Sequence, residues 1–360
     1  MSRTRAERRG DRSPWLSICV PQFNRTPFLL AALATIGEQT FRDVEVCISD
    51  DASTDGGQEQ IVAALERSPH DYVYDRREQN GRYDANLRSS LALARGEYCL
   101  LLGNDDGLAD PRVLEELHQV AAGGARSPHV IVSNYCDAAG QVYRRVPRTG
   151  TRTGSPALAA TAYRNFSFLG GVALRREVAE RHRTEHWDGS EFYQTWLACR
   201  GLAAGGDLLE WDRVAVRMGL ELPGLEVESY ARRPRAAGLA ERRLNLPALA
   251  ELVVDAVTPF TSPAERRAIA ARIAFQTLAF TYPFWLVEYR RVQSWSFAAG
   301  VARGMRPERL LDRLPLSRAH RVALTALYGA ASVAGLTIPV AAFDAARWRL
   351  YDLEKRTVRS

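Results

Sequence analysis

The chain has 360 residues, of which 46% are hydrophobic and 25% are charged, the values of a soluble globular protein rather than a disordered one. The length suits one α/β catalytic domain and a C-terminal appendage of about 100 residues. The net charge is +6, and residues 301–360 hold eleven Lys or Arg against five Asp or Glu, so the positive excess lies at the C-terminal end. This basic region suits an anionic surface or acceptor, and a solvated helical face explains it equally well.

The N-terminal end, the cysteines and the absence of certain motifs exclude several other classes of protein. Residues 1–14 are arginine-rich and lack the apolar core of a secretory signal, so they predict a disordered basic tail. The five cysteines form no CxxC pair, which predicts buried thiols rather than disulfides or a zinc site. No GxxxxGK[ST] or GxSxG motif occurs, and no GxGxxG follows the first predicted strand, which argues against a P-loop enzyme, an α/β-hydrolase and a dinucleotide oxidoreductase.

Short apolar strands alternate with helical patterns over the first part of the chain. The predicted strands are residues 16–20, 44–49, 72–74, 98–102 and 129–132. The predicted helices are residues 27–39, 56–67, 83–94 and 113–121. This alternation predicts an α/β fold with a mainly parallel sheet flanked by helices, in which ligands bind at the carboxyl ends of the strands.

The pattern changes after residue 135. We expect a strand at 141–146 that pairs with the preceding one, a loop at 149–156, an apolar segment at 166–174, a helix at 191–200 and a strand at 208–216. Residues 219–238 are rich in Gly, Pro and Arg, so they predict a flexible linker. The domains are therefore expected at 15–218 for catalysis and at 239–360 for a C-terminal helical region.

Two acidic clusters follow predicted strands. Asp50 and Asp51 end one strand, and Asp105 and Asp106 follow Asn104 after another. A carboxylate at such a place can accept hydrogen bonds from a base N–H or from ribose hydroxyls, which is the role we expect of Asp51. The second cluster offers oxygen ligands for Mg²⁺ or Mn²⁺, a cation that carboxylates often bridge to a diphosphate. A capped turn and an acidic turn before a helix are the structural alternatives.

Four stretches resemble the family 2 glycosyltransferases, which have the GT-A fold. They are LSICVPQFNR (Leu16–Arg25), SDDASTDGG (Ser49–Gly57), QNGRYDANLRSSLALARGEYCLLLGNDD (Gln79–Asp106) and FLGGVALRREV (Phe168–Val178). They occur in the family's order and approximate spacing. The YDAN stretch and the GNDD ending are most similar to abequosyltransferase-type enzymes, which decorate bacterial surface glycans.

The resemblance implies a nucleotide-sugar site. Pro21, Asn24 and Arg25 would line the nucleotide pocket, and Asp51 would contact the base. The diphosphate side would be shaped by Asn80, Gly81 and Asn86, the ribose held by Asp105 and the metal by Asp106. Asn104 stands where the family often has Asp, and an amide oxygen is a weaker metal ligand than a carboxylate.

A carboxylate must also deprotonate the acceptor hydroxyl in an inverting transfer. The segment His186–Trp196, HWDGSEFYQTW, stands after the Gly-Gly segment and before a predicted helix, where the resemblance places the base. It offers Asp188 and Glu191, and Asp188 is slightly favoured, with helix capping as its structural alternative. Its aromatic side chains could form a sugar platform, although core packing is the expected role of any one of them.

Residues 322–343 carry no charge, a length that could span a bilayer. Their Ala, Gly, Thr and Ser content and Pro339 favour a buried or interfacial helix instead. The C-terminal region as a whole could complete the acceptor site, bring the enzyme to a lipid-linked acceptor, make peripheral contact with the inner face of the membrane through its basic residues, or form a homodimer.

The sequence therefore predicts a cytoplasmic, metal-assisted inverting glycosyltransferase. Its donor would be a nucleoside-diphosphate sugar and its acceptor a glycan, a lipid-linked or a small-molecule hydroxyl, with no nucleic-acid partner. A catalytically idle GT-A module that binds glycan or nucleotide is the alternative from another class. A sugar nucleotidyltransferase would need a Gly-rich basic loop after the first strand, where this chain has PQFNR.

Overall fold

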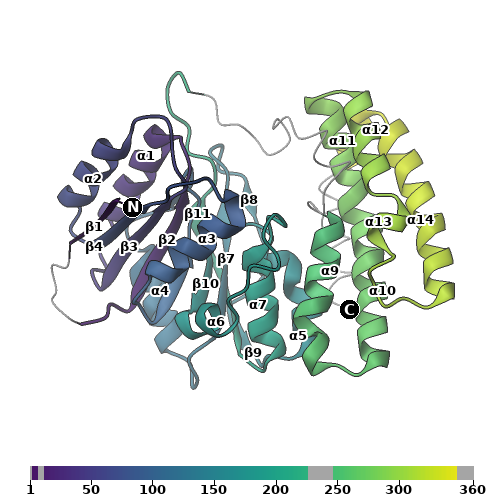
Figure 1. Ribbon diagram of the computed structural model, residues 1–360, viewed down its shortest axis with the longest axis horizontal. Helices are drawn as coiled ribbons and strands as arrows, with labels where there is room; N and C mark the ends of the chain where they lie inside the picture. Colours follow the sequence, from purple (N-terminus) through teal and green to yellow (C-terminus); the bar gives the residue numbers. More distant parts are fainter. Residues whose placement is uncertain (1, 7–11, 226–245, 347–360) are drawn as a thin grey trace. The chain divides into compact units, whose positions relative to one another are not determined.

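The structure is a computed structural model that describes residues 2–6, 12–225 and 246–346 (Figure 1). The chain divides into two compact units, Met1–Leu158 with Ala162–Val227, and Ala159–Thr161 with Glu228–Ser360. The division after Val227 falls within the predicted linker 219–238, of which residues 226–238 lie outside the described residues.

The first unit is built on one mixed sheet. Its described strands are β1 (Ser2–Ala6), β2 (Leu16–Gln22), β3 (Val44–Asp50), β4 (Asp71–Arg76), β5 (Tyr98–Leu101), β6 (Gly107–Leu108), β7 (Val130–Cys136), β8 (Val142–Tyr143), β9 (Gly150–Arg152), β10 (Val172–Arg175) and β11 (Leu208–Arg217). The strand order is β1-β4-β3-β2-β5-β10-β7-β11-β6, with β8 beside β7 and β9 beside β11. Strands β4, β3, β2 and β5 are parallel, and β10 runs antiparallel between β5 and β7.

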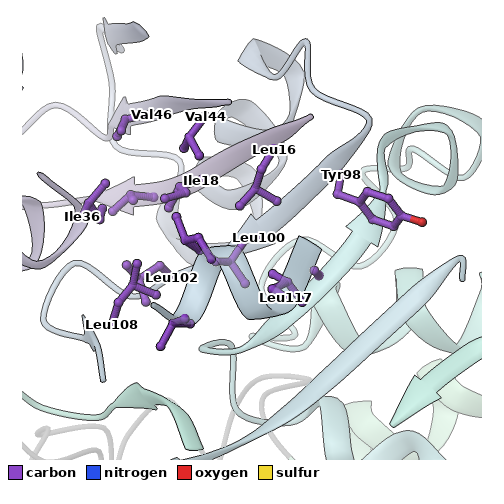
Figure 2. Close-up of a cluster of buried hydrophobic side chains, with 14 of the residues drawn as sticks. Leu16, Ile18, Ile36, Val44, Val46, Tyr98, Leu100, Leu102, Leu108 and Leu117 are labelled. Carbon is purple, nitrogen blue, oxygen red and sulfur yellow. The ribbon is translucent and has the colours of Figure 1, made fainter. Parts of the chain in front are cut away.

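Helices cover both faces of this sheet. Those of the first part of the chain are α1 (Thr26–Gly37), α2 (Gln58–Arg67), α3 (Arg82–Leu93), α4 (Val113–Ala122), α5 (Pro156–Ala162), α6 (Arg176–Arg181) and α7 (Tyr193–Ala203). Helices α1, α2 and α4 bury their apolar side chains against β2, β3 and β5 in one core cluster, part of which Figure 2 shows around Leu16, Ile18 and Leu100. Helices α3, α6 and α7 pack against one another in a separate group (Figure 1).

The hydrophobic pattern predicted most of these elements. Every strand and helix expected before residue 135 is present, and β8 pairs with β7 as predicted. Four cysteines, Cys19, Cys47, Cys99 and Cys199, are buried thiols, and none of the five forms a disulfide. The mainly parallel α/β sheet and the C-terminal helical region are confirmed.

Two local predictions differ from the structure. The tail predicted to be disordered contains β1, which pairs antiparallel with β4, and the loop predicted at 149–156 contains β9, which pairs with β11. Both segments are polar and have no strand pattern of their own. They form strands because a neighbouring strand offers an unpaired backbone edge, which the sequences of the two segments do not reveal. Helix α6 was not predicted, because its six residues are too few to show a period.

The second unit is helical. Its described helices include α9 (Leu246–Val257), α10 (Pro263–Gln276), α11 (Tyr282–Val292), α12 (Trp295–Gly304), α13 (Pro307–Leu310) and α14 (Arg318–Thr337). A Cβ on Gly335 would meet Leu286 Cδ1 at 2.7 Å, so glycine lets α14 pack closely on α11. Within the described residues no single helix has the length and composition to cross a bilayer, and α14 satisfies these criteria only together with Val340–Ala346, across a bend of 108°.

Candidate active site

Three neighbouring parallel strands, β3, β2 and β5, end at the same edge of the sheet. The segment after β2 contacts the segments that follow both neighbours. On one side, Asn24 Oδ1 accepts a hydrogen bond of 2.8 Å from the backbone N–H of Thr54. On the other, Arg25 Nη1 lies 2.7 Å from Asp105 Oδ2. The segments that carry the two acidic clusters therefore lie on either side of the end of β2.

Asp50 and Asp51 have different roles although they are adjacent. Asp50 is buried, and its carboxylate accepts hydrogen bonds from the Tyr74 hydroxyl and from the N–H of Ser53, so it holds the turn. Asp51 Oδ1 accepts hydrogen bonds from Arg77 Nη1 at 2.8 Å and from the Gly81 N–H at 2.9 Å. Because both contacts use Oδ1, the other oxygen retains acceptor capacity for a ligand. Burial raises the pKa of Asp51, and the Gly81 N–H and Arg77 oppose that rise.

A network of amide side chains lies beneath the end of β2. Gln22 Oε1 accepts a hydrogen bond from Asn104 Nδ2 at 2.8 Å, and Asn86 Nδ2 donates to the Gln22 carbonyl at 2.9 Å. Asn86 Oδ1 is buried and has no hydrogen-bond partner among the described residues. The amide of Asn104 thus ties the acidic loop to β2, and a carboxylate at this position could not donate that hydrogen bond.

The carboxylates of Asp105 and Asp106 converge over Gly103. A Cβ on Gly103 would lie 2.6 Å from Asp106 Oδ2 and 3.2 Å from Asp105 Oδ1, so only glycine leaves both oxygens in place. The Gly219 N–H donates to Asp106 Oδ1 at 3.0 Å. Burial, with the charge of Asp105 as the second cause, raises the pKa of Asp106 to about 7. Two anions held this close favour a cation beside them.

This pair of carboxylates fits a divalent cation that a diphosphate would also bind. Among the described residues there is no group of three or more His, Cys, Asp or Glu side chains that could hold a metal ion alone. Mg²⁺ and its relatives are often bound by one or two carboxylates, with substrate phosphates completing the coordination shell. The carboxylates of Asp105 and Asp106 agree with a cation that is held partly by the protein and partly by substrate phosphates.

The two carboxylates considered as the base lie in different environments. Both oxygens of Asp188 form an ion pair with the guanidinium of Arg88, with an Nη2–Oδ2 distance of 2.8 Å. Glu191 has a left-handed backbone conformation, φ 64°, just before α7. Burial raises the pKa of Tyr83 well above its usual value, and the charges of Glu191 and Asp106 act in the same direction.

The remaining predicted residues fall into two groups. Pro21, near the end of β2, is partly exposed. Asn80 is exposed, and its Oδ1 accepts a hydrogen bond from the Arg82 N–H. Trp187, Tyr193 and Trp196 are no more than 6% exposed, so they pack in the core rather than form a sugar platform. This agrees with the role expected of such aromatic side chains.

Sequence reasoning missed four residues that organise the site: Arg77, Asp84, Arg88 and Arg145. Asp84 and Arg88 are four residues apart in a predicted helix, a spacing that places them on one helix face and could have marked them as a pair. Arg145 had no such signal. Its buried guanidinium donates to the carbonyls of Ser133, Asn165, Phe168 and Gly170, and so fixes the glycine loop before β10.

Comparison with known proteins agrees with this geometry. A family model described as "Glycosyl transferase family 2" matches residues 17–181. This segment is a family 2 glycosyltransferase domain. It contains the strand ends that carry Asp51 and Asp106, and it stops before Asp188 and Glu191.

Curated relatives match about a quarter of the chain. The abequosyltransferase RfbV of Salmonella typhimurium is 41% identical over 96 residues, which is 26% of this chain and 29% of that protein. The GalNAc(5)-diNAcBac-PP-undecaprenol beta-1,3-glucosyltransferase of Campylobacter jejuni is 34% identical over 97 residues, 26% of this chain and 31% of that protein. The chain thus matches less than a third of the length of either relative. The first of them agrees with the resemblance to abequosyltransferases.

Solved structures share the fold over most of the chain. TarS of S. aureus, residues 1–349 in complex with UDP, has a TM-score of 0.57 at 16% identity and covers 88% of this chain and 90% of its own. The mannosyltransferase PcManGT from Pyrobaculum calidifontis, in complex with GDP-Man and Mn²⁺, has a TM-score of 0.51 at 18% identity and covers 91% and 88%. The fold of this chain is therefore GT-A.

Proposed function

We propose that this glycosyltransferase chain is an inverting enzyme that transfers a sugar from a nucleoside-diphosphate sugar to an acceptor hydroxyl, assisted by a divalent cation. The observation that supports this most strongly is the convergence of the two acidic strand ends on the end of β2. One side offers a buried aspartate for a nucleoside and the other a pair of carboxylates for a cation beside a diphosphate. The solved neighbours are described as complexes with UDP, UDP-GlcNAc, and GDP-Man with Mn²⁺.

On the donor side, Asp51 would accept hydrogen bonds from the base, and Arg77 Nη1 donates to Asp51 Oδ1 and opposes the rise of its pKa. Pro21, Asn24 and Arg25 at the end of β2, and Asn80 and Gly81 before α3, would surround the nucleotide. Asp105 is held by Arg25 and would contact the ribose, while Asp106 would hold Mg²⁺ or Mn²⁺. The cation would supply charge stabilisation for the leaving diphosphate.

On the acceptor side we assign the base to Glu191 rather than Asp188. A carboxylate whose two oxygens are both bound by an arginine has little capacity left for an acceptor hydroxyl. Glu191 stands just before α7, and its charge, like that of Asp106, acts to raise the pKa of the Tyr83 hydroxyl. The acceptor oxygen would attack the anomeric carbon as its proton passes to Glu191. The bond from that carbon to the diphosphate breaks, and the nucleoside diphosphate leaves with the electron pair.

The acceptor is proposed only as a hydroxyl of a glycan, a lipid-linked or a small molecule. The names of the relatives cover more than one of these classes, since one acts on an undecaprenol-linked glycan and another is a validoxylamine A glucosyltransferase. A cytoplasmic location, contact of the basic C-terminal region with the inner face of a membrane, and a homodimer remain predictions.

A binding panel followed by a turnover assay tests the proposal. Thermal unfolding is measured with UDP-GlcNAc, UDP-glucose, GDP-mannose, dTDP-glucose and CDP-glucose, each with and without Mn²⁺, because a ligand stabilises the folded state in proportion to the logarithm of its concentration over Kd. Release of nucleoside diphosphate is then measured for the wild type, for Asp106→Ala and for wild type with EDTA.

We expect one nucleotide class to stabilise the protein most, with turnover lost in Asp106→Ala and in EDTA. Asp207→Asn is the matched control, because Asp207 is also a buried aspartate but precedes β11, away from the flanked strand ends. Full turnover in EDTA would refute the role of the metal. Binding without turnover of any donor would support the idle GT-A module instead.

A further inference from the structure

One face of α3 holds the segment that contains the proposed base. Asp84, in the first turn of α3, is 1% exposed and is the acceptor for three donors from that segment. Its Oδ2 accepts from the Glu191 N–H at 2.8 Å and from the Ser190 hydroxyl at 3.4 Å, and its Oδ1 accepts from the Tyr193 N–H at 3.1 Å. One turn later Arg88 binds Asp188 and the Thr184 carbonyl.

These contacts satisfy backbone groups that α7 cannot satisfy by itself. The first N–H groups of a helix have no partner within it, and α7 has no side-chain cap at its own N-cap residue, Phe192. Asp84 supplies the cap from another helix, 109 residues away for Tyr193. The same carboxylate binds Glu191 in a left-handed conformation, which a residue with a Cβ seldom adopts unless its surroundings enforce it.

We propose that Asp84 is a positioning residue, which fixes the backbone of Glu191 so that the Glu191 carboxylate is presented to the acceptor. This inference rests on the proposed function and goes beyond it, because Asp84 is only 1% exposed and the proposed function gives it no contact with donor or acceptor. Asp84 is not itself a base, since it is buried and both of its oxygens already accept hydrogen bonds from donors of the protein.

The position of Asp84 also links the two halves of the reaction. Gly81, immediately before α3, donates its N–H to Asp51, and Asp84 three residues later holds Glu191. One short rigid segment therefore touches both the residue proposed for the nucleoside and the residue proposed for the acceptor. A shift of α3 on donor binding would move both contacts together.

A variant series separates positioning from simple stabilisation of α7. The proteins are wild type, Asp84→Asn, Glu191→Gln, the double variant, and the control Asp207→Asn. An asparagine keeps one acceptor oxygen but places an amide NH₂ against one of the backbone N–H groups, so it can hold Glu191 or Tyr193 but not both. Release of nucleoside diphosphate gives kcat and KM for whichever of the five named nucleotide sugars the wild type turns over.

We expect Asp84→Asn to lower kcat by about 10- to 100-fold, because small misplacement of a reacting group has effects of this size. KM for the donor should change little, since the donor contacts stay intact. We expect Glu191→Gln to lose at least as much, and the double variant to lose no more than Glu191→Gln alone, because a base that is absent cannot be mispositioned. Asp207→Asn should retain the wild-type kcat.

Three outcomes would overturn the inference. An Asp84→Asn variant with wild-type kcat, losses that multiply in the double variant, or an increase in KM that accounts for the whole effect would each show that Asp84 does not act through Glu191. Absence of turnover by the wild type would instead overturn the proposed function itself, and the inference with it.

Discussion

Replacing Asp84 with asparagine removes a carboxyl group whose pKa the fold raises from 3.8 to about 6. Burial is the main cause of this shift, and the charges of Glu191 and Asp188 add to it, while the N–H groups of Glu191 and Tyr193 oppose it. Each unit of pKa shift corresponds to 1.36 kcal/mol, so ionised Asp84 makes the folded state less stable by ~3 kcal/mol than an aspartate with an ordinary pKa would.

The pH dependence follows from which state holds the proton. Below an ordinary aspartate pKa, both the folded and the unfolded chain carry the protonated group, so the shift has no effect on stability. Between 3.8 and about 6 the unfolded state loses its proton while the folded state keeps it, so the stability of the wild type falls as the pH rises. The free energy of unfolding of wild type minus that of Asp84→Asn should therefore fall by ~3 kcal/mol from acid to neutral pH and then stay level.

Urea unfolding of both proteins at several pH values between about 4 and 7.5 measures this difference. Hydrogen exchange is labelled briefly at one fixed pH and followed in peptides from β2 and β3. The exchange of these peptides reports the unfolding of the unit that contains Asp84 and not that of the helical unit. The hydrogen bonds that asparagine loses add an offset that does not vary with pH, so only the slope is diagnostic. A level difference, or one that rises with pH, would refute the assignment of a raised pKa.

Three further variants test contacts at the site. Gly57→Ala should lower the free energy of unfolding in urea by ~3 kcal/mol or more, because the new Cβ would lie 1.9 Å from the hydroxyl oxygen of Thr26, the first residue of α1. A Cβ on Gly37 would meet nothing within 4 Å, so Gly37→Ala should change that free energy little. Arg145→Lys should lower the free energy of unfolding by ~3 kcal/mol, because it replaces a buried guanidinium that donates to four carbonyls. Arg144 is exposed, so Arg144→Lys should change the free energy of unfolding by no more than ~0.5 kcal/mol. Asp51→Asn should weaken the binding of UDP, or of the nucleotide that the panel selects, by about 10- to 100-fold in calorimetric titration, and unchanged affinity would remove Asp51 from the nucleotide site.

The proposed site shows which residues a sequence can and cannot reveal. Asp51 and Asp106 stand directly after apolar strands, and parallel strands end at one edge, so their meeting follows from the alternation of strands and helices. The choice between Asp188 and Glu191 does not follow from any local pattern. It depends on where Arg88 lies, and Arg88 precedes Asp188 by 100 residues.

By itself, the sequence determined the parts of this protein that depend on near neighbours in the chain. Apolar periodicity produced the strands and helices up to residue 135, and short motifs placed the acidic clusters at strand ends and indicated the family. These signals are local because a strand or helix forms from the spacing of its own residues.

Only the tertiary structure decided which partner each polar side chain meets. The antiparallel insertion of β10, the pairing of β1 and β9 with neighbouring strand edges, and the capping of α7 by Asp84 all join segments that are distant in sequence. Such contacts depend on the order of strands in the sheet and on which helix face turns toward which loop. A polar residue has the same local pattern whether its partner is water, a backbone N–H or an arginine from another helix.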